Sequence, residues 1–290
     1  MSALLSTAKL LISCQDRPGI IASVTNFLAL QGINIIHADQ HSLLVNGRKS
    51  FFMRLEFEYD QKLIDIDNLL NDFKKDVASL YEMEWNIFRD NQIKRIAILV
   101  SKMDHCMLEI LWRWQSKEIY GDIPLIISNH DVLQKEVESF GIPFYYLPIQ
   151  KEHKEKQEIE ILKLLNDNQI DLVILARYMQ VLSSNFINKY TNKIINIHHS
   201  FLPAFAGADP YGQAIDRGVK VVGATAHYAT EKLDQGPIIE QDVIRLTHKD
   251  SKKKILELGK EVERSVLARA VKWHLEDRVF VVNNKTIVFN

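Results

Sequence analysis

Cysteine is scarce in this chain, and its charges nearly cancel. Only two of the 290 residues are cysteines, Cys14 and Cys106, and they stand far apart in the sequence. A disulfide framework is therefore not expected, and the reducing cytoplasm is the expected location. The formal net charge is −1, and neither end carries a basic tail. Neither nucleic acid nor a membrane surface is thus an expected partner, although a small anionic substrate needs only a local patch of positive charge.

Long apolar runs are also missing. No uncharged apolar stretch reaches the roughly 18 residues that a membrane-spanning helix needs. The apolar start of the chain is short and runs directly into Asp16 and Arg17, which indicates a first β-strand and not a signal peptide. What the chain does have is 47% hydrophobic residues, enough for an ordinary globular core, and a length typical of two domains.

Residues 1–89 are expected to form a small α+β domain. Apolar residues recur at helical spacing from Ile20 until Gly32 ends the helix, and residues 50–59 alternate as a strand does. The full set of expected elements is a strand at 10–14, a helix from 20, strands at 34–38 and 50–59, a helix at 63–80 and a strand at 81–88. This βαββαβ order is the ferredoxin-like arrangement.

Residues 90–290 are expected to form a second, larger α/β domain after a polar linker at 89–92. Its first strand, 96–100, is apolar throughout, as strands of a buried parallel sheet are. Expected strands at 124–128, 144–147, 172–176 and 194–198 alternate with helices at 106–115, 131–139, 155–166 and 183–190. That alternation predicts a Rossmann-like, doubly wound parallel sheet. Ligands bind such sheets at the carboxyl ends of the strands, where Ser101, Arg177 and the segment 196–198 are expected.

The residues suited to catalysis lie at the end of the strand at 194–198 and in a turn further along. Asn196 and His198 are two positions apart in a strand and so face the same side. An amide can donate a hydrogen bond to an oxyanion, and an imidazole can move protons near neutral pH. Asp234 stands in a tight turn before another expected strand, and a carboxylate near His198 could orient that imidazole and an attacking water.

Simpler explanations exist for each of these residues. A polar pair at a strand end is more often structural than catalytic, and Asp234 two residues before Gly236 is an ordinary turn signal. A metal site is not expected, because the chain has no HExxH motif and His198 and His199 should point to opposite faces of their strand.

A family resemblance favours the catalytic explanation of these residues over the structural one. The segments that carry it are Asn196-Ile197-His198-His199-Ser200-Phe201-Leu202-Pro203-Ala204-Phe205, Gly207-Ala208, Pro210-Tyr211, Gln213-Ala214, Arg217-Gly218-Val219, Gly223-Ala224-Thr225-Ala226-His227-Tyr228 and Leu233-Asp234-Gln235-Gly236-Pro237-Ile238-Ile239. They closely resemble the formyltetrahydrofolate deformylases of the formyltransferase superfamily. The resemblance extends over almost the whole chain. It implies hydrolysis of 10-formyltetrahydrofolate to formate and tetrahydrofolate, with the folate as substrate and with no cofactor.

The resemblance also implies residue roles. Asn196 would polarise the formyl oxygen, His198 would stabilise the tetrahedral intermediate and share in proton transfer, and Asp234 would orient His198 and activate water. The backbone of Met179, Gln180, Val181 and Leu182 would hold the pterin ring, and Thr230 would begin the folate-binding loop that ends at Asp234. Without the resemblance, the segment 179–182 would be the start of a helix with core side chains.

Two features favour hydrolysis over formyl transfer to an amine. A ribonucleotide acceptor needs a phosphate cradle, typically a glycine-rich turn after the first strand, and the turn at 101–106 contains no glycine. The second feature is the N-terminal domain, which the related transferases lack. A transferase and a catalytically silent folate or amino-acid sensor remain the alternatives. Gly212 stands where the family usually has histidine, and Asp209 where a basic or amide residue is commoner.

The N-terminal domain resembles an ACT domain, a small ligand-sensing module. The residues that carry this resemblance are Asp16-Arg17-Pro18-Gly19-Ile20 and Gly32-Ile33-Asn34-Ile35. Asp16, Gly19 and Asn34 are the candidate effector-binding residues, since a glycine lets a helix N-terminus approach a ligand closely. The resemblance implies glycine or methionine as effector and a homo-oligomer, a dimer or a tetramer. As a bare dipeptide, Pro18-Gly19 is only a strand-to-helix turn.

Overall fold

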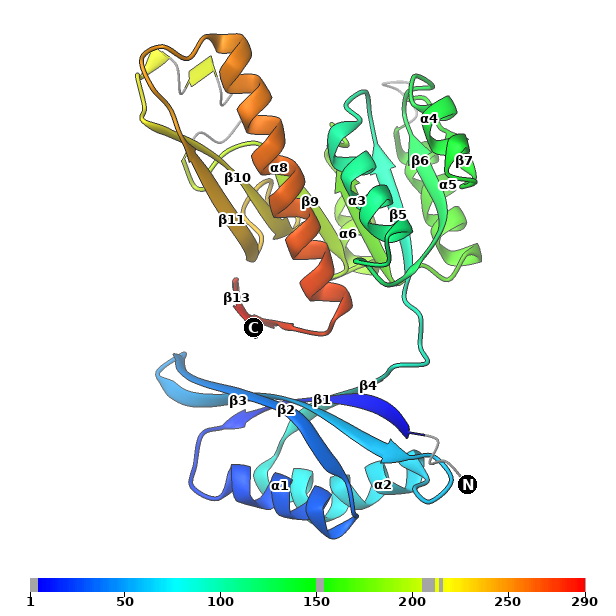
Figure 1. Ribbon diagram of the computed structural model, residues 1–290, viewed down its shortest axis with the longest axis vertical. Helices are drawn as coiled ribbons and strands as arrows, with labels where there is room; N and C mark the ends of the chain where they lie inside the picture. The colour runs from blue at the N-terminus through cyan, green and yellow to red at the C-terminus, as the bar shows by residue number, and fades with distance from the viewer. Residues whose placement is uncertain (1–4, 150–153, 205–211, 214–215, 290) are drawn as a thin grey trace. The chain divides into compact units, whose positions relative to one another are not determined.

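The computed structural model describes residues 5–149, 154–204, 212–213 and 216–289 (Figure 1). The chain divides into two compact units, one formed by residues up to Gln92 together with Phe289 and the other by residues 93–288. Each unit has its own sheet and its own buried core. Within the described ranges, no helix is both long and apolar enough to cross a membrane.

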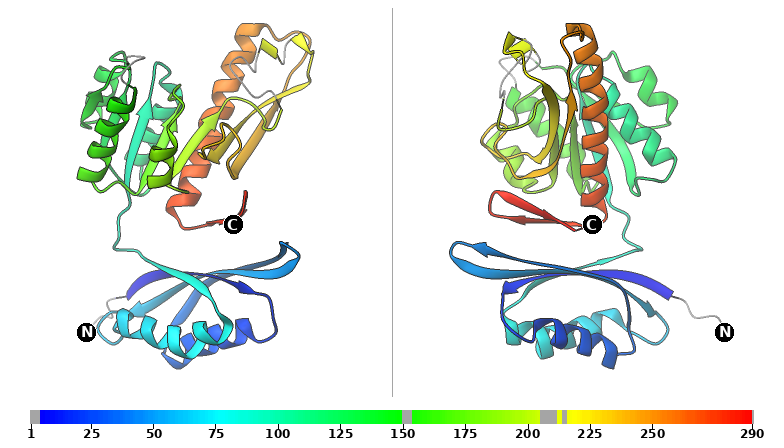
Figure 2. Two further views of the ribbon diagram at one scale, coloured as in Figure 1. Left: turned by 180° about the vertical axis from the view of Figure 1, so that it is seen from behind. Right: turned by 60° about the vertical axis from the view of Figure 1, so that its left-hand side comes forward.

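The first unit is a four-stranded antiparallel sheet in the order β2-β3-β1-β4, with its helices on one face (Figure 2). Its elements are β1 (Leu5–Gln15), α1 (Ile20–Leu30), β2 (Asn34–Val45), β3 (Arg48–Asp60), α2 (Ile66–Phe73), the π-helical turn η1 (Lys74–Ala78), the 3-10 turn η2 (Ser79–Tyr81) and β4 (Glu84–Arg89). This is the expected ferredoxin-like order. Phe57, Leu10 and Phe73 are among its fully buried side chains.

Two strands of this unit are much longer than expected, and the first is β1, which spans Leu5–Gln15 where a strand at 10–14 was predicted. The predicted strand at 34–38 continues as β2 to Val45 and pairs with β3 as far as Arg48. Between the two strands, Asn46 and Gly47 have φ values of 50° and 78°, which is the backbone of a two-residue hairpin turn. Most of β2 is exposed, so its sequence lacks the apolar alternation on which the prediction depended.

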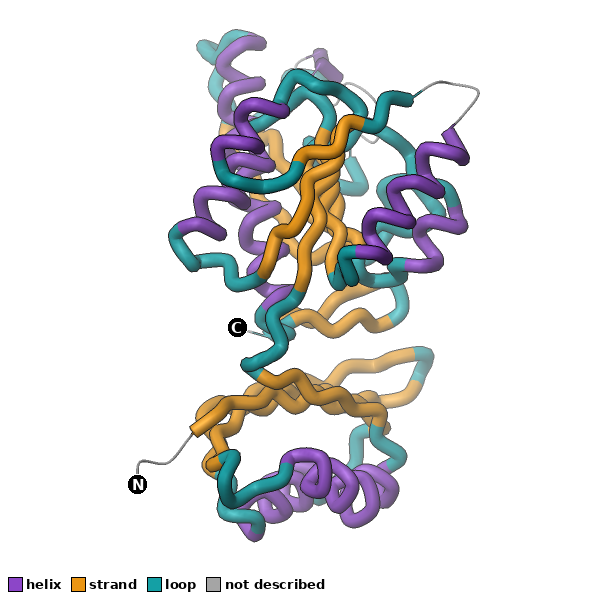
Figure 3. Tube along the Cα trace, turned by 90° about the vertical axis from the view of Figure 1, so that its right-hand side faces the viewer, coloured by secondary structure: helices purple, strands orange, loops and turns teal. Residues whose placement is uncertain are grey.

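The second unit is a seven-stranded mixed sheet in the order β11-β10-β9-β8-β5-β6-β7, with helices on both faces (Figure 3). Its elements up to β11 are β5 (Arg95–Val100), α3 (His105–Gln115), β6 (Asp122–Ser128), α4 (Gln134–Ser139), β7 (Phe144–Tyr146), α5 (Lys154–Asp167), β8 (Leu172–Ala176), α6 (Ser184–Lys189), β9 (Ile194–His198), β10 (Val221–Tyr228) and β11 (Ile238–Arg245). Strands β5 to β9 are parallel, as expected, whereas β10 and β11 run antiparallel.

The apolar strands are buried on both faces. In β5, Ile96 and Ile98 belong to the core cluster on the side of α3 and α8, whereas Ala97 and Leu99 belong to the cluster on the side of α5 and α6. This two-sided burial explains why these strands have no apolar alternation.

The longest helix was not foreseen from the sequence. Helix α8 (Lys252–Leu275) packs on β9, β10 and β11 and against α3, and the hairpin of β12 (Val279–Val282) and β13 (Lys285–Val288) follows it. The Ser251 side chain accepts a hydrogen bond from the amide of Lys254 and caps the helix N-terminus. Val266 and Leu267 place one face of α8 in the core.

The sheet reverses its winding between β5 and β8. Strands β6 and β7 extend the sheet from one side of β5, and β8 and β9 extend it from the other. The carboxyl ends of β5 and β8 therefore flank the topological switch point, which is where doubly wound sheets bind ligands. The residues that follow these two ends are Ser101 and Arg177.

Candidate active site

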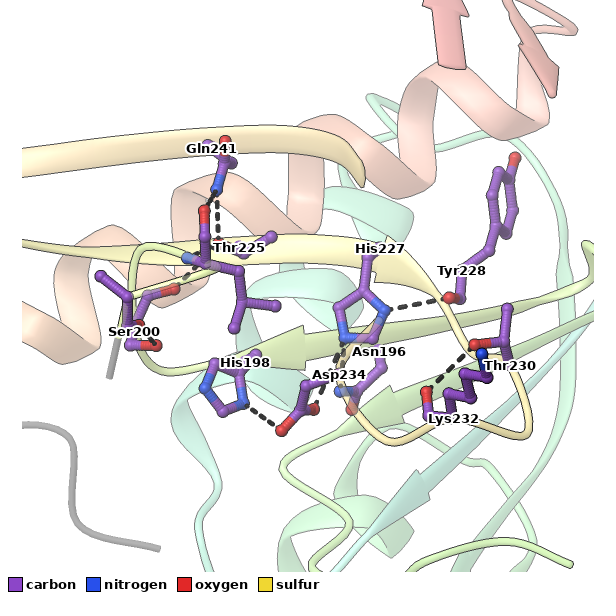
Figure 4. Close-up of polar contacts among 12 residues, drawn as sticks. Asn196, His198, Ser200, Thr225, His227, Tyr228, Thr230, Lys232, Asp234 and Gln241 are labelled. Carbon is purple, nitrogen blue, oxygen red and sulfur yellow. Dashed lines mark hydrogen bonds and ion pairs between the residues drawn. The ribbon is translucent and has the colours of Figure 1, made fainter. Parts of the chain in front are cut away.

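The predicted catalytic residues meet where β9, β10 and the connection from β10 to β11 come together (Figure 4). Asn196 and His198 lie on β9, and Asp234 lies in the connection. The distance from Oδ2 of Asp234 to Nδ1 of His198 is 3.4 Å. The expected grouping of the three residues is therefore present in the fold.

His227 is a fourth member of this group, and sequence reasoning missed it. It lies on β10 directly opposite Asn196 on β9. Its Nε2 is 3.1 Å from Nδ2 of Asn196 and 3.8 Å from Oδ1 of Asp234. The available signal was a histidine in a mostly apolar strand, but only the antiparallel pairing of β10 with β9 places it beside Asn196.

The hydrogen bonds of His227 define its tautomer. Its Nδ1 lies 2.9 Å from the carbonyl oxygen of Tyr228, which can only accept, so Nδ1 carries the proton. Burial lowers the pKa of His227, so the ring is neutral and Nε2 accepts. Asn196 therefore donates one N–H of its amide to His227, which leaves the other N–H for a ligand.

Asp234 is held in place by its backbone. Its φ is 55°, in the left-handed region that aspartate tolerates better than most residues. Two residues later, a Cβ on Gly236 would stand 1.7 Å from the carbonyl oxygen of Tyr228, so only glycine fits. The contact with His198 lowers the pKa of Asp234, which is ionised at neutral pH.

His198 directs its second nitrogen away from Asp234. Its side chain is 7% exposed, and Nε2 is buried without a hydrogen-bond partner among the described residues. A buried ring nitrogen without a partner is costly unless a ligand completes it. Nε2 is thus the atom of the Asp234–His198 pair that is available to a substrate.

The expectation for His199 was wrong. His198 and His199 should have faced opposite sides of a strand, but β9 ends at His198 and the two ring centroids lie only 5.3 Å apart. Burial, followed by the charge of Arg177, lowers the pKa of His199 to about 4. His199 is therefore neutral and is no source of positive charge at the site.

A buried hydrogen-bond network fixes the chain after His198. The hydroxyl of Thr225 donates to the carbonyl of Ser200 at 2.8 Å and accepts from the amide of Leu202 at 3.0 Å. The amide of the Gln241 side chain donates to both Thr225 and the carbonyl of Leu202, at 2.9 Å each. Figure 4 shows Thr225 and Gln241 on the neighbouring strands β10 and β11.

A pocket of about 290 Å³ opens beside these residues. The predicted folate-binding residues all line it, and they are Met179, Gln180, Val181, Leu182 and Thr230. The alternative explanation of the segment 179–182 was a helix start with core side chains. Leu182 does belong to the core, but Met179 and Val181 are more than half exposed. Exposed apolar side chains at a pocket rim suit a flat, partly apolar ligand such as a pterin ring.

The candidate effector residues in the first unit have partners within that unit. Asp16 is paired with Lys49 at 2.8 Å, and the side chain of Asn34 donates to Glu58 at 2.7 Å. Gly19 has a φ of 94° and precedes α1, and the hydroxyl of Tyr81 lies 3.0 Å from where a Cβ would be. Of the two positions that depart from the family pattern, Gly212 is described, whereas Asp209 lies outside the described residues.

Both units of the chain resemble known proteins. Residues 94–271 match the Formyl transferase family, and residues 8–61 match the ACT domain family. The formyltetrahydrofolate deformylase of Synechocystis is 50% identical over 98% of both chains, and that of Bacillus subtilis is 47% identical over 97% of this chain and 93% of its own. The chain belongs to the formyltetrahydrofolate deformylase family. A crystal structure of the deformylase from Pseudomonas syringae matches 98% of this chain and 95% of its own with a TM-score of 0.93 and 45% identity.

Members of another branch of the fold resemble only part of this deformylase. A glycinamide ribonucleotide transformylase from Symbiobacterium toebii matches over 98% of its own length but covers 71% of this chain, with a TM-score of 0.66 and 25% identity. The match to the deformylases, in contrast, includes both units of the chain.

Proposed function

We propose that this chain hydrolyses 10-formyltetrahydrofolate to formate and tetrahydrofolate, and that Asn196, His198 and Asp234 carry the reaction. The observation that carries the proposal is the contact of 3.4 Å between Asp234 and His198 at one end of a pocket that also contains Asn196. The pterin ring would lie against the segment 179–182, and Thr230 would contact the folate from the opposite loop. No cofactor takes part in this reaction scheme.

The reaction has two steps at the formyl carbon. Water attacks this carbon and gives one proton to the Asp234–His198 pair, while the free N–H of Asn196 donates to the developing oxyanion. The bond from carbon to N10 then breaks as N10 takes a proton from the pair. Formic acid loses its remaining proton to solvent, so the products are formate and tetrahydrofolate.

Formyl transfer to an amine is the less favoured function. The turn at 101–106, which would have to hold the phosphate of a ribonucleotide acceptor, contains no glycine and begins with the buried side chain of Ser101. Ser101 Oγ is 2.7 Å from Oδ1 of Asn129 and 3.1 Å from the backbone nitrogen of Met179, so this hydroxyl holds the loops together.

The deciding experiment measures formate release with and without an added amine. We expect release without any amine, and a loss of about a hundred- to ten-thousandfold in kcat for Asp234→Asn, because the pair can no longer take a proton from water. Asp242→Asn is the matched control, since Asp242 is an ion-paired carboxylate on β11 that does not line the pocket. Undiminished acceptor-independent formate release by Asp234→Asn would contradict the mechanism.

We also propose that glycine or methionine regulates the enzyme through the first unit, around Asp16, Gly19 and Asn34, and that the protein is a cytoplasmic homo-oligomer. The ACT family match and the left-handed Gly19 at the start of α1 support an effector site here. Formate release titrated with each amino acid, for the native chain and for Asn34→Ala, tests the effector. Light scattering separates monomer, dimer and tetramer, and an unchanged rate at saturating glycine and methionine would contradict the regulation.

A further inference from the structure

A buried group of polar side chains fills the topological switch point of the second unit. His105 begins α3 after β5, Arg177 follows β8, and Glu263 reaches them from α8. Oε2 of Glu263 is 2.8 Å from Nε2 of His105 and 3.5 Å from Nε of Arg177. Cys106 is fully buried beside them. We call these four residues the switch-point cluster.

The cluster is costly to the fold. The side chains of His105, Arg177 and Glu263 are 7%, 13% and 2% exposed. Within the described part of the chain, Nδ1 of His105 and both Nε and Nη1 of Arg177 are buried without a hydrogen-bond partner. Arg177 also has a φ of 62°, a left-handed conformation that costs an L-residue of this size about 1–2 kcal/mol. Such costs at one place commonly indicate a functional role.

A metal ion is the obvious alternative occupant, because donor atoms of His105, Cys106 and Glu263 lie within 4.8 Å of one another. Two observations argue against it. The contact between His105 and Glu263 is a direct hydrogen bond, and the guanidinium of Arg177 already supplies positive charge to the same carboxylate oxygen. Burial, followed by the charge of Glu263, raises the pKa of the Cys106 thiol well above its usual value, which weakens Cys106 as a metal ligand because metals bind the thiolate.

The switch-point cluster lies where a doubly wound sheet would bind a ligand. A doubly wound sheet binds its ligand in the crevice at the switch point, and here the protein's own side chains occupy the ends of β5 and β8. The cluster borders the proposed catalytic pocket through Arg177, which lines that pocket. A formyl transferase must admit a second substrate next to the formyl group, whereas a hydrolase must admit only water.

We propose that the switch-point cluster is the specificity determinant of this enzyme: it occupies the space that an amine acceptor needs and leaves water as the acceptor. This inference rests on the proposed function above. The chemistry is the same for both nucleophiles. A lone pair bonds to the formyl carbon, the nucleophile loses one proton, the bond from carbon to N10 breaks, and N10 gains one proton. Water gives formate, and a primary amine gives a neutral formamide.

The test is the partition of product between two acceptors. Arg177→Gly removes the guanidinium and suits the left-handed backbone, so the variant opens the crevice without new strain. With 10-formyltetrahydrofolate and glycinamide as the amine, we expect the native enzyme to give formate alone. For Arg177→Gly we expect the ratio of N-formylglycinamide to formate to rise by about tenfold or more, the range that changes in a pocket wall produce. The ratio is informative because a general loss of activity leaves it unchanged.

Two further variants keep the proposal falsifiable if Arg177→Gly folds poorly. The double variant Arg177→Gly with Glu263→Gln also removes the carboxylate charge of Glu263, which would be unpaired without Arg177. The variant His105→Ala shortens the side chain on the other side of Glu263. Gln169→Gly is the matched control, because Gln169 has a φ of 51° but is exposed in the connection from α5 to β8. An unchanged product ratio in the three cluster variants, or a stoichiometric metal in the purified native protein that is lost in His105→Ala, would overturn the proposal. Failure of the native enzyme to release formate would instead reject the proposed function.

Discussion

Nδ2 of Asn196 donates a hydrogen bond of 3.1 Å to Nε2 of His227, across directly opposed positions of β9 and β10. This bond fixes the orientation of the Asn196 amide and leaves its second N–H for a ligand of the pocket that Asn196 lines. On the proposed mechanism, the neutral His227 accepts from the amide and holds it without competing with the oxyanion for a donor. His227 is thus a positioning residue for Asn196.

Replacement of His227 by phenylalanine should lower kcat more than it changes KM. The ring still fills the space on β10, but Asn196 loses the acceptor that holds its amide, and small misplacements of a donor cost about ten- to a hundredfold. Steady-state formate release gives both constants. His227→Gln is the matched variant, because its side-chain oxygen can still accept from Asn196. Equal losses in both variants would show that burial of the ring, and not the hydrogen bond, is what matters.

Thr225→Val should destabilise the second unit and disorder the chain after His198. Valine has nearly the same shape, but it leaves the amide of Leu202 and the carbonyl of Ser200 without their partner. Each buried group that loses its partner costs about 1–3 kcal/mol of the free energy of unfolding. Urea denaturation measures this loss. Thr191→Val, at an exposed position, should change the free energy of unfolding little, and a stable Thr225→Val would show that Gln241 alone is sufficient.

Gly236→Ala should reduce both stability and activity. A Cβ there would collide with the carbonyl oxygen of Tyr228, which also accepts from Nδ1 of His227, so the loop carrying Asp234 must shift. We expect a lower Tm and a fall of about a hundredfold in kcat, the cost of moving a reacting group by about 1 Å. Gly141→Ala is the control that separates the steric collision from the strain of a positive φ. Gly141 has a φ of 74° but open space around it. Full activity in Gly236→Ala would show that the loop can accommodate the shift.

The free energy of unfolding should fall as the pH drops below about 6.5, the pKa of a histidine in an unfolded chain. Burial lowers the pKa of His199 to about 4 and that of His274 to about 3, so the unfolded chain takes up these protons first. The contribution of these two histidines to the free energy of unfolding is fully present above their pKa in the unfolded chain. It is lost as the pH falls towards their pKa values in the folded protein. Each unit of pKa shift is worth about 1.4 kcal/mol at most.

His274→Gln should flatten this pH dependence. The Nδ1 of His274 is 2.7 Å from the hydroxyl of Tyr228, and an amide can replace that contact without taking up a proton. Thermal melts of both proteins between pH 7 and the acid limit of folding provide the comparison. An identical slope in the two proteins would exclude His274 as the titrating group.

Local patterns predicted the parallel part of the sheet and the placement of Asn196 and His198 on one side of β9. The apolar runs of β5 and β8 identify buried strands by composition alone, and the spacing of Asn196 and His198 follows from the strand period. Their grouping with Asp234, and the roles, came from the family resemblance and not from spacing. Asp234 itself has a local sequence that any turn could have.

What the sequence could not predict depends on contacts between distant segments. His227 becomes a partner of Asn196 only through the antiparallel pairing of β10 with β9. Glu263 reaches His105 from a position 158 residues further along the chain, on a helix that no motif had indicated. The prediction that His198 and His199 face opposite sides of a strand was wrong for a related reason. The end of β9 at His198 depends on the neighbouring strands of the sheet.

The order of the proposed catalytic residues along the chain has a consequence for biosynthesis. Asn196 and His198 belong to the parallel part of the sheet, whereas His227, Asp234 and α8 are supplied by the last quarter of the protein. As a chain emerges from the ribosome, its parallel strands can pair before those later residues exist. On the proposed mechanism, a nascent or truncated chain that ends before Asp234 lacks the carboxylate partner of His198 and is expected to release no formate.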